Sequence, residues 1–190
     1  MKIFISGMPK VGKTTLCRKI FENFKDKIKI SGFLTEEKNE NNKRVGFEIV
    51  LLPSEKRFLF ASKEKISNIS YAGYYLNLSI LEKIIEKVEK EIENSDLIII
   101  DEIGKMEMKS YKFKSFIEKI LELEINLIAT LHREFISNFK NFEIIWLKRE
   151  NFDEVYEKII KKLWAGSLVV KRPADNREIG SSNLPRPMGP

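Results

Sequence analysis

A glycine-rich octapeptide near the amino end carries the clearest chemistry of the sequence. Residues 7–14 read Gly-Met-Pro-Lys-Val-Gly-Lys-Thr, which fits the pattern G-x-x-x-x-G-K-[ST] and follows the apolar run Ile3–Ile5. Glycine at the first and sixth positions lets the chain curl until several N–H groups point at one phosphate, and the helix expected after the loop adds its positive end. The octapeptide therefore predicts a polyphosphate-binding loop.

Individual side chains of this loop have separate expected roles. Lys13 reaches the β- and γ-phosphates, and the Thr14 hydroxyl binds a Mg²⁺ ion that bridges them. Thr15 stands one residue further into the helix and is expected to contact the α-phosphate. The expected nucleotide-binding residues at this end of the chain are Gly7, Met8, Pro9, Lys10, Val11, Gly12, Lys13, Thr14 and Thr15.

A second segment, in the middle of the chain, offers the acids that phosphate chemistry needs. The apolar run Leu97–Ile100 ends in Asp101 and Glu102. A carboxylate at the end of a strand beside a phosphate loop holds Mg²⁺, and we expect Asp101 to share the ion with Thr14. Successive strand residues point to opposite sides, so Glu102 is expected to diverge from Asp101 and to accept a proton from an attacking water. The expected nucleotide-binding residues of this segment are Asp101, Glu102, Ile103 and Gly104.

Hydrolysis of a triphosphate also needs a positive charge where the γ-phosphate leaves. The candidates for this role are Lys105, Arg44, Arg133 and Lys10. We favour Lys105 as the third catalytic residue, beside Lys13 and Glu102, because it follows the acids closely in the sequence. The chain carries 34 Lys and Arg residues, so surface cations without a catalytic role are common in it.

Three further polar residues near the ends of expected elements have two interpretations each. Thr130 either hydrogen-bonds the γ-phosphate or the attacking water, or packs as an ordinary strand residue. His132 is the single histidine, and with no second His or Cys nearby we expect a loop residue and not a metal ligand. Asn151 either contacts the nucleotide base or caps the next helix, with Glu154 three residues further on.

The pattern of apolar residues predicts an α/β fold. Buried parallel strands are expected at four apolar runs, 3–5, 97–100, 127–131 and 144–147, with amphipathic helices between them. An antiparallel hairpin extension is expected at three strand-like segments, 32–35, 45–52 and 57–61. The polar run 36–44 links the first two of these. Alternation of strands and helices implies right-handed crossovers and a three-layer α/β sandwich with a mostly parallel sheet.

A shift of composition separates one domain, residues 1–164, from a tail, residues 165–190. The tail carries four of the six prolines and shows no helical or strand period. It cannot bury much apolar surface, and we expect it to be disordered or non-native.

Overall composition narrows the class of protein. The formal net charge is +6, but basic residues alternate with glutamates along the expected helices, which argues against a nucleic-acid partner. One cysteine excludes a disulfide framework, and neither a charged-then-apolar leader nor an apolar run of ~20 residues is present. We therefore expect a cytoplasmic protein without a membrane segment. A chain that is 33% charged and rich in Ile, Lys and Glu is typical of proteins from hot environments.

These motifs together resemble the small nucleoside-triphosphatase family of thermophiles, which has a human relative called cancer-related nucleoside-triphosphatase. The likeness spans about residues 1–163, and its most specific piece is Asp-Glu-Ile-Gly-Lys-Met-Glu at 101–107. Other matching segments are 32–37, 44–47, 74–78, 129–130 and 150–151. The resemblance implies a RecA-like P-loop fold and Mg²⁺-dependent hydrolysis of ATP, GTP and other nucleoside triphosphates to diphosphate and phosphate.

Two other functions stay open at this point. A small-molecule or nucleotide kinase uses the same loop and Mg²⁺, but it normally brings an arginine-rich lid, and between residues 28 and 78 the chain has only Arg44 and Arg57. A nucleotide-dependent switch that binds a partner protein would have little use for Glu102. The sequence also lacks the Asn-Lys-x-Asp motif of guanine-specific switches.

Overall fold

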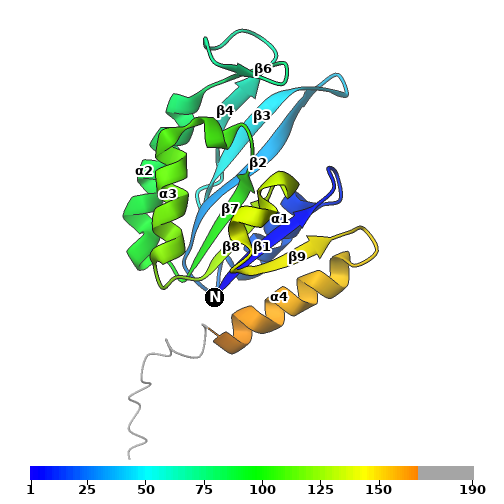
Figure 1. Ribbon diagram of the computed structural model, residues 1–190, viewed down its shortest axis with the longest axis vertical. Helices are drawn as coiled ribbons and strands as arrows, with labels where there is room; N and C mark the ends of the chain where they lie inside the picture. Colours follow the sequence, from blue (N-terminus) through cyan, green and yellow to red (C-terminus); the bar gives the residue numbers. More distant parts are fainter. Residues whose placement is uncertain (167–190) are drawn as a thin grey trace, which may run out of the picture.

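A single mixed sheet organises the computed structural model, which describes residues 1–166 (Figure 1). Its nine strands lie in the order β5-β6-β4-β3-β2-β7-β8-β1-β9. The strands are β1 (Lys2–Gly7), β2 (Ile30–Glu40), β3 (Lys43–Leu52), β4 (Lys56–Ser62), β5 (Ser70–Tyr71), β6 (Tyr74–Leu76), β7 (Leu97–Ile103), β8 (Leu127–Leu131) and β9 (Glu143–Leu147). The α-helices are α1 (Lys13–Phe24), α2 (Leu78–Glu91), α3 (Tyr111–Glu122) and α4 (Phe152–Gly166), and the 3₁₀ helices are η1 (Ile92–Asn94), η2 (Glu107–Lys109) and η3 (Arg133–Phe139).

The parallel half of the sheet consists of β2, β7, β8, β1 and β9. The four strands expected from apolar runs are confirmed as β1, β7, β8 and β9. Parallel neighbours carry their carboxyl ends to the same edge of a sheet, so the ends of β1, β7 and β8 lie close together. Residues that are far apart in the sequence meet at this edge.

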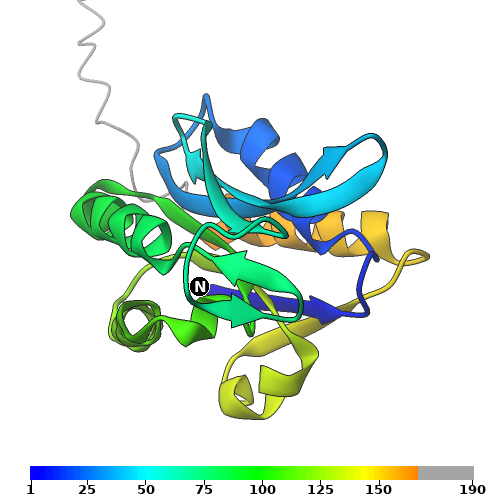
Figure 2. The ribbon, with the colours of Figure 1, turned by 90° about the horizontal axis from the view of Figure 1, so that it is seen from above.

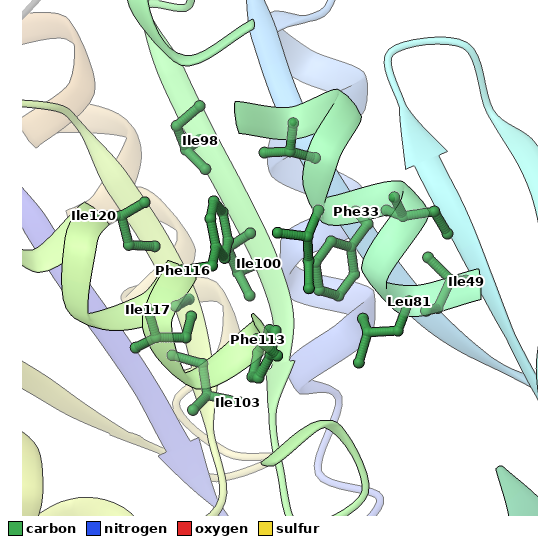
Figure 3. Close-up of a cluster of buried hydrophobic side chains, with 14 of the residues drawn as sticks. Phe33, Ile49, Leu81, Ile98, Ile100, Ile103, Phe113, Phe116, Ile117 and Ile120 are labelled. Atoms are coloured by element: carbon green, nitrogen blue, oxygen red, sulfur yellow. The ribbon is translucent and has the colours of Figure 1, made fainter. Parts of the chain in front are cut away.

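Alternating side chains of the strands divide the core into two layers. On one face of the sheet, Phe33, Ile98 and Ile100 pack against α2 and α3. On the other face, Ile3 and Ile5 belong to a second cluster with residues of α1 and α4. Figure 2 shows these two pairs of helices on opposite sides of the sheet. The first cluster is drawn in Figure 3, which labels Phe33, Ile49, Leu81, Ile98, Ile100, Ile103, Phe113, Phe116, Ile117 and Ile120.

The antiparallel extension grows directly from the parallel core through β2. This strand pairs with β7 in parallel over its first residues and with β3 in antiparallel fashion along almost its whole length. The prediction of a polar linker over 36–44 is wrong, because β2 continues to Glu40 and β3 begins at Lys43. Asn41 and Asn42, both at positive φ, form the tight turn between them. This part of the ribbon buries little of either face, so it shows no apolar alternation in the sequence.

The last described helix, α4, reaches into the segment that we expected to be a tail. It ends at Gly166, two residues beyond the predicted end of the domain. The remainder of that segment, 167–190, lies outside the described residues. No helix within residues 1–166 is long and apolar enough to cross a membrane.

Gly32 in β2 is a sharp test of this architecture. Its φ is +124°, and a Cβ at this position would stand 1.9 Å from the carbonyl oxygen of Ile99 in the paired strand β7. We expect Gly32→Ala to lower the free energy of unfolding by about 3 kcal/mol or more, through backbone strain and separation of β2 from β7. Urea unfolding of the purified variant measures this loss.

Gly73→Ala is the matched control for that substitution. Gly73 also has a positive φ, +82°, but nothing lies within 4 Å of its Cβ position. Only backbone strain of about 1–2 kcal/mol is expected there. Equal losses for the two variants would contradict a close contact between β2 and β7.

Candidate functional site

The phosphate-binding loop predicted at residues 7–14 connects β1 to α1. β1 ends at Gly7, and α1 begins at Lys13. Gly12 caps the helix in a left-handed conformation with φ 105°, and its carbonyl accepts the first helical hydrogen bond from the Leu16 N–H at 2.8 Å. No acidic side chain stands in the first turn of α1, so its positive end is not neutralised within the helix.

Asp101 lies buried at the carboxyl end of β7, with 1% of its surface exposed. Its Oδ1 accepts a hydrogen bond of 2.5 Å from the Thr130 hydroxyl, and its Oδ2 accepts one of 3.4 Å from the Thr35 N–H. The Thr14 side chain is a third donor to this carboxyl group. The structure therefore brings together Thr14 and Asp101, the two residues expected to hold a metal ion.

The buried setting changes the acidity of Asp101. Loss of hydration raises its pKa to about 6, and the nearby charge of Glu102 adds to the rise. Hydrogen bonds from Thr130, Thr14 and Thr35 stabilise the ionised form and oppose the rise. A desolvated carboxylate attracts a cation, because a positive charge beside it offsets the lost hydration.

Glu102 faces the cleft, although not by simple strand alternation. The pairing of β7 with β8 is irregular at this point, so that Asp101 and Glu102 both lie opposite Thr130, between the pairs Ile100–Ala129 and Ile103–Leu131. Such a bulge re-aims side chains beside an active site. Burial raises the pKa of Glu102, and the ammonium group of Lys13 opposes that rise. A carboxylate of raised basicity next to a phosphate loop is suited to receive a proton.

A cleft of about 720 Å³ opens above these groups. The phosphate loop and α1 form one wall, and the β2–β3 hairpin forms the facing wall. Its lining residues are Gly7, Pro9, Lys10, Gly12, Lys13, Thr14 and Thr15 of the loop, Arg18 of α1, Thr35, Glu36, Glu37, Arg44 and Phe47 of the hairpin, and Glu102, His132 and Arg133 at the strand ends. All the predicted residues of the loop except Met8 and Val11 thus share one cleft with the acid Glu102.

Lys105, the favoured cation, lies apart from the lining of this cleft. Its Nζ is 2.6 Å from the Glu134 carboxylate. Lys105 and Glu102 line a smaller adjoining pocket of about 290 Å³. The catalytic role of Lys105 stays a prediction, because its ammonium group is paired with the Glu134 carboxylate in this structure.

Several other predicted nucleotide contacts have structural positions of their own. Asn151 accepts a hydrogen bond from the Lys148 N–H at 2.8 Å and donates one to the Trp146 carbonyl at 3.1 Å, so it braces the loop before α4. Ile103 is fully buried in the core. Met8, 49% exposed, contacts the Arg133 guanidinium through its sulfur. Val11 packs against the second core cluster, and Gly104 lines the smaller pocket.

Sequence reasoning missed most of the hairpin wall, of which it named only Arg44 as a candidate cation. Thr35 supplies a backbone donor to Asp101, and its own hydroxyl oxygen is buried without a hydrogen-bond partner among the described residues. Phe47 and Arg44 come from the strand that follows. Apart from the charge of Arg44, the signal for this wall in the sequence was the matching segments at 32–37 and 44–47, because the polar run 36–44 suggested a linker.

Glu107 is a further acid that the sequence did not single out as functional. It is 5% exposed at the start of η2, and its Oε2 would stand 2.6 Å from a Cβ at Gly104. Burial raises the pKa of Glu107 to about 8, and the charges of Glu102 and Asp101 add to the rise. Glu107 therefore carries its proton at neutral pH, which limits the negative charge beside the cleft.

Comparison with known proteins places the chain among nucleotide-hydrolysing relatives. A family model described as NTPase matches residues 2–160. The chain is 39% identical over 170 residues to nucleoside-triphosphatase THEP1 of Methanocaldococcus jannaschii, and the match covers 87% of this chain and 99% of that protein.

Two solved structures are similar over most of the chain. The crystal structure of THEP1 from the hyperthermophile Aquifex aeolicus superposes with a TM-score of 0.74 at 34% identity, covering 86% of this chain and 99% of that one. The solution structure of a human cancer-related nucleoside triphosphatase gives a TM-score of 0.67 at 25% identity, covering 87% and 98%. The α/β fold with a mixed sheet described above is therefore similar to that of these two proteins.

The raised pKa of Glu107 predicts how stability depends on pH in the protein without ligands. An unfolded chain releases this proton near pH 4.5, whereas the folded protein keeps it until about pH 8. The unfolded state thus binds fewer protons between these values, and stability falls there by up to about 1.4 kcal/mol per pH unit. Glu107→Gln removes this contribution, so the variant gains on the wild type as pH rises from 4.5 to 8. Urea unfolding over a pH series measures the difference.

The control is Glu118→Gln, on the exposed face of α3. Its stability curve is expected to run parallel to that of the wild type. A parallel curve for Glu107→Gln as well would show that Glu107 ionises normally in the folded protein.

Proposed function

The chain belongs to the NTPase family, and from this premise we propose that it is a Mg²⁺-dependent enzyme that hydrolyses nucleoside triphosphates to diphosphate and phosphate. The observation that carries the proposal is the convergence of the phosphate loop with the acids of β7. Thr14 donates to Asp101, and Lys13 and Glu102 line the same cleft. Relatives at 39% identity bear the name nucleoside-triphosphatase, which supports the same activity here.

The residues at the base of the cleft fit Mg²⁺. This ion prefers oxygen ligands and keeps several of its waters. The Thr14 hydroxyl and the Asp101 carboxylate supply two such oxygens side by side, and the unpartnered Thr35 hydroxyl is available to a water of the ion. We assign Thr14 and Asp101 as the residues that hold Mg²⁺. The ion would neutralise charge on the β- and γ-phosphates.

The residues of the chain have the following roles in the proposed reaction. The loop N–H groups and Lys13 bind the triphosphate. Glu102 accepts a proton from water as the water oxygen bonds to the γ-phosphorus. The bond from phosphorus to the β–γ bridging oxygen breaks, and its electron pair stays on the diphosphate.

The fold supports the same assignment at a finer level. In the parallel half of the sheet, β8 separates the strand of the phosphate loop, β1, from the strand of the acids, β7. Helices pack on both faces. We propose that this is the RecA-like three-layer arrangement that the motif resemblance implies.

Phosphate release tests the function directly. We expect inorganic phosphate from ATP, GTP and other triphosphates in the presence of Mg²⁺, and its loss after EDTA treatment, with recovery when excess Mg²⁺ is returned. A kinase would instead transfer the phosphoryl group to an added acceptor and release little phosphate without one. Absence of phosphate release from every triphosphate would overturn the proposal.

Glu102→Gln tests the proposed base. The amide cannot take up the proton of water, so kcat is expected to fall by ~10²- to 10⁴-fold, while the Kd of a non-hydrolysable triphosphate analogue changes little. Glu118→Gln, far from the cleft on α3, serves as the control with unchanged turnover. A kcat for Glu102→Gln close to that of the wild type would remove Glu102 from the mechanism.

A further inference from the structure

The cleft has two walls of different chemistry. The loop wall supplies backbone N–H groups and Lys13, whereas the hairpin wall supplies the carboxylates of Glu36 and Glu37, the ring of Phe47 and one cation, Arg44. A triphosphate held by the loop directs its γ-phosphate toward Glu102 and thus toward the space between the walls. The charge that develops on the leaving side needs a cation from a group that is already in place.

The other two arginines that line the cleft have protein partners, and Lys10 and Lys13 belong to the loop wall. Arg18 forms ion pairs with Glu36 and with Glu55, the latter at 2.7 Å. Arg133 donates to the Met8 sulfur at 3.2 Å, on the loop side of the cleft. Neither guanidinium faces the loop from the opposite wall.

Arg44 differs from Arg18 and Arg133 because its contacts fix the orientation of the guanidinium group and leave part of that group exposed. Its Nε donates to the Tyr74 hydroxyl at 3.0 Å, and its Nη1 donates to Glu37 at 2.7 Å. The guanidinium carbon lies 5.2 Å from the centroid of the Phe47 ring. No hydrogen bond from Nη2 to any residue of the described chain is present, and the side chain is 39% exposed.

This geometry is that of a pre-organised anion-binding group. A guanidinium whose Nε is held by a phenol and whose Nη1 is held by a carboxylate, with a ring near the group, loses little further entropy when Nη2 binds phosphate oxygens. The hydrogen bond to Tyr74 and the ion pair to Glu37 also raise the pKa of Arg44, so its charge is permanent.

We propose that Arg44 is a catalytic residue that binds the γ-phosphate from the hairpin wall and stabilises the charge of the transition state. The inference rests on the proposed function and deepens it, because it makes the cleft complete within one chain. Tyr74 and Glu37 are positioning residues that hold the guanidinium. The reaction then needs no arginine from a partner protein. It also does not need Lys105, which is paired with Glu134.

Steady-state kinetics with chemical rescue test this role. Arg44→Ala is expected to lower kcat by ~10²- to 10³-fold, with less than ~10-fold change in KM, because the interaction strengthens in the transition state. Guanidinium ion added at millimolar concentration is expected to restore part of the kcat of Arg44→Ala, and to leave Glu102→Gln unrestored. A purely structural role for Arg44 would show no such selective rescue.

Two further variants sharpen the result. Arg44→Lys keeps the charge but loses the planar group with several fixed N–H donors. Its kcat is expected to lie between those of the wild type and Arg44→Ala. Arg57→Ala is the matched control: Arg57 also extends from the hairpin sheet and pairs with Glu36 and Glu48, but it is not part of the cleft lining. Its kcat is expected to stay within about 3-fold of the wild type. Thermal melting of each variant establishes that it is folded.

The possible outcomes separate this inference from the proposed function. A wild type that hydrolyses no triphosphate overturns the proposed function and this inference with it. An active wild type with a kcat of Arg44→Ala within about 3-fold of it, or a folded but inactive Arg44→Ala that guanidinium does not restore, overturns the role of Arg44 alone.

Discussion

The site depends on keeping one carboxylate, that of Asp101, inside the protein. Burial of an ionised acid is costly, and three donors offset part of that cost: a hydroxyl from the neighbouring strand, a hydroxyl from the phosphate loop and an N–H from β2. Each donor comes from a different element. Strand β8 lies between β1 and β7 and carries Thr130. Its position in the sheet therefore also helps to stabilise the buried charge of Asp101.

The same constraint explains why the acids beside Asp101 differ in acidity. Three carboxyl groups within one short segment cannot all ionise in a low-dielectric setting. Glu107 lies buried beside the charges of Glu102 and Asp101 and keeps its proton, whereas Glu102 faces Lys13 and the open cleft. A bound cation at Asp101 would lower the cost of charge for the whole segment. Folding and the ionisation of these acids are thus coupled through one patch of buried charge, and binding of the proposed metal ion would be coupled to both.

Local chemistry made part of this site predictable from the sequence. The phosphate loop is continuous in the chain, and an apolar run that ends in Asp101 marks the edge of a parallel sheet, so both could be placed without coordinates. The facing wall was not predictable in the same way, because the residues between Thr35 and Arg44 bury little surface and leave no apolar period. Proximity in the sequence was the ground for favouring Lys105 as the catalytic cation, and that role stays a prediction. Lys105 follows the acids directly but pairs with Glu134, whereas Arg44 reaches the cleft across a turn of two asparagines.

The two walls of the cleft are held by different forces, and this difference has consequences for function. The loop wall stands on the fully buried strands β1 and β7, with a core on both faces. The outer hairpin relies on charged contacts, such as the ion pairs of Arg18 and Arg57 with Glu36 and of Arg44 with Glu37. Exposed ion pairs are individually weak, and salt screens them. Salt does not screen buried apolar contacts in this way. The phosphate loop therefore stands on the part of the sheet that is packed on both faces, whereas the end of the hairpin that carries Arg44 depends on contacts that salt weakens.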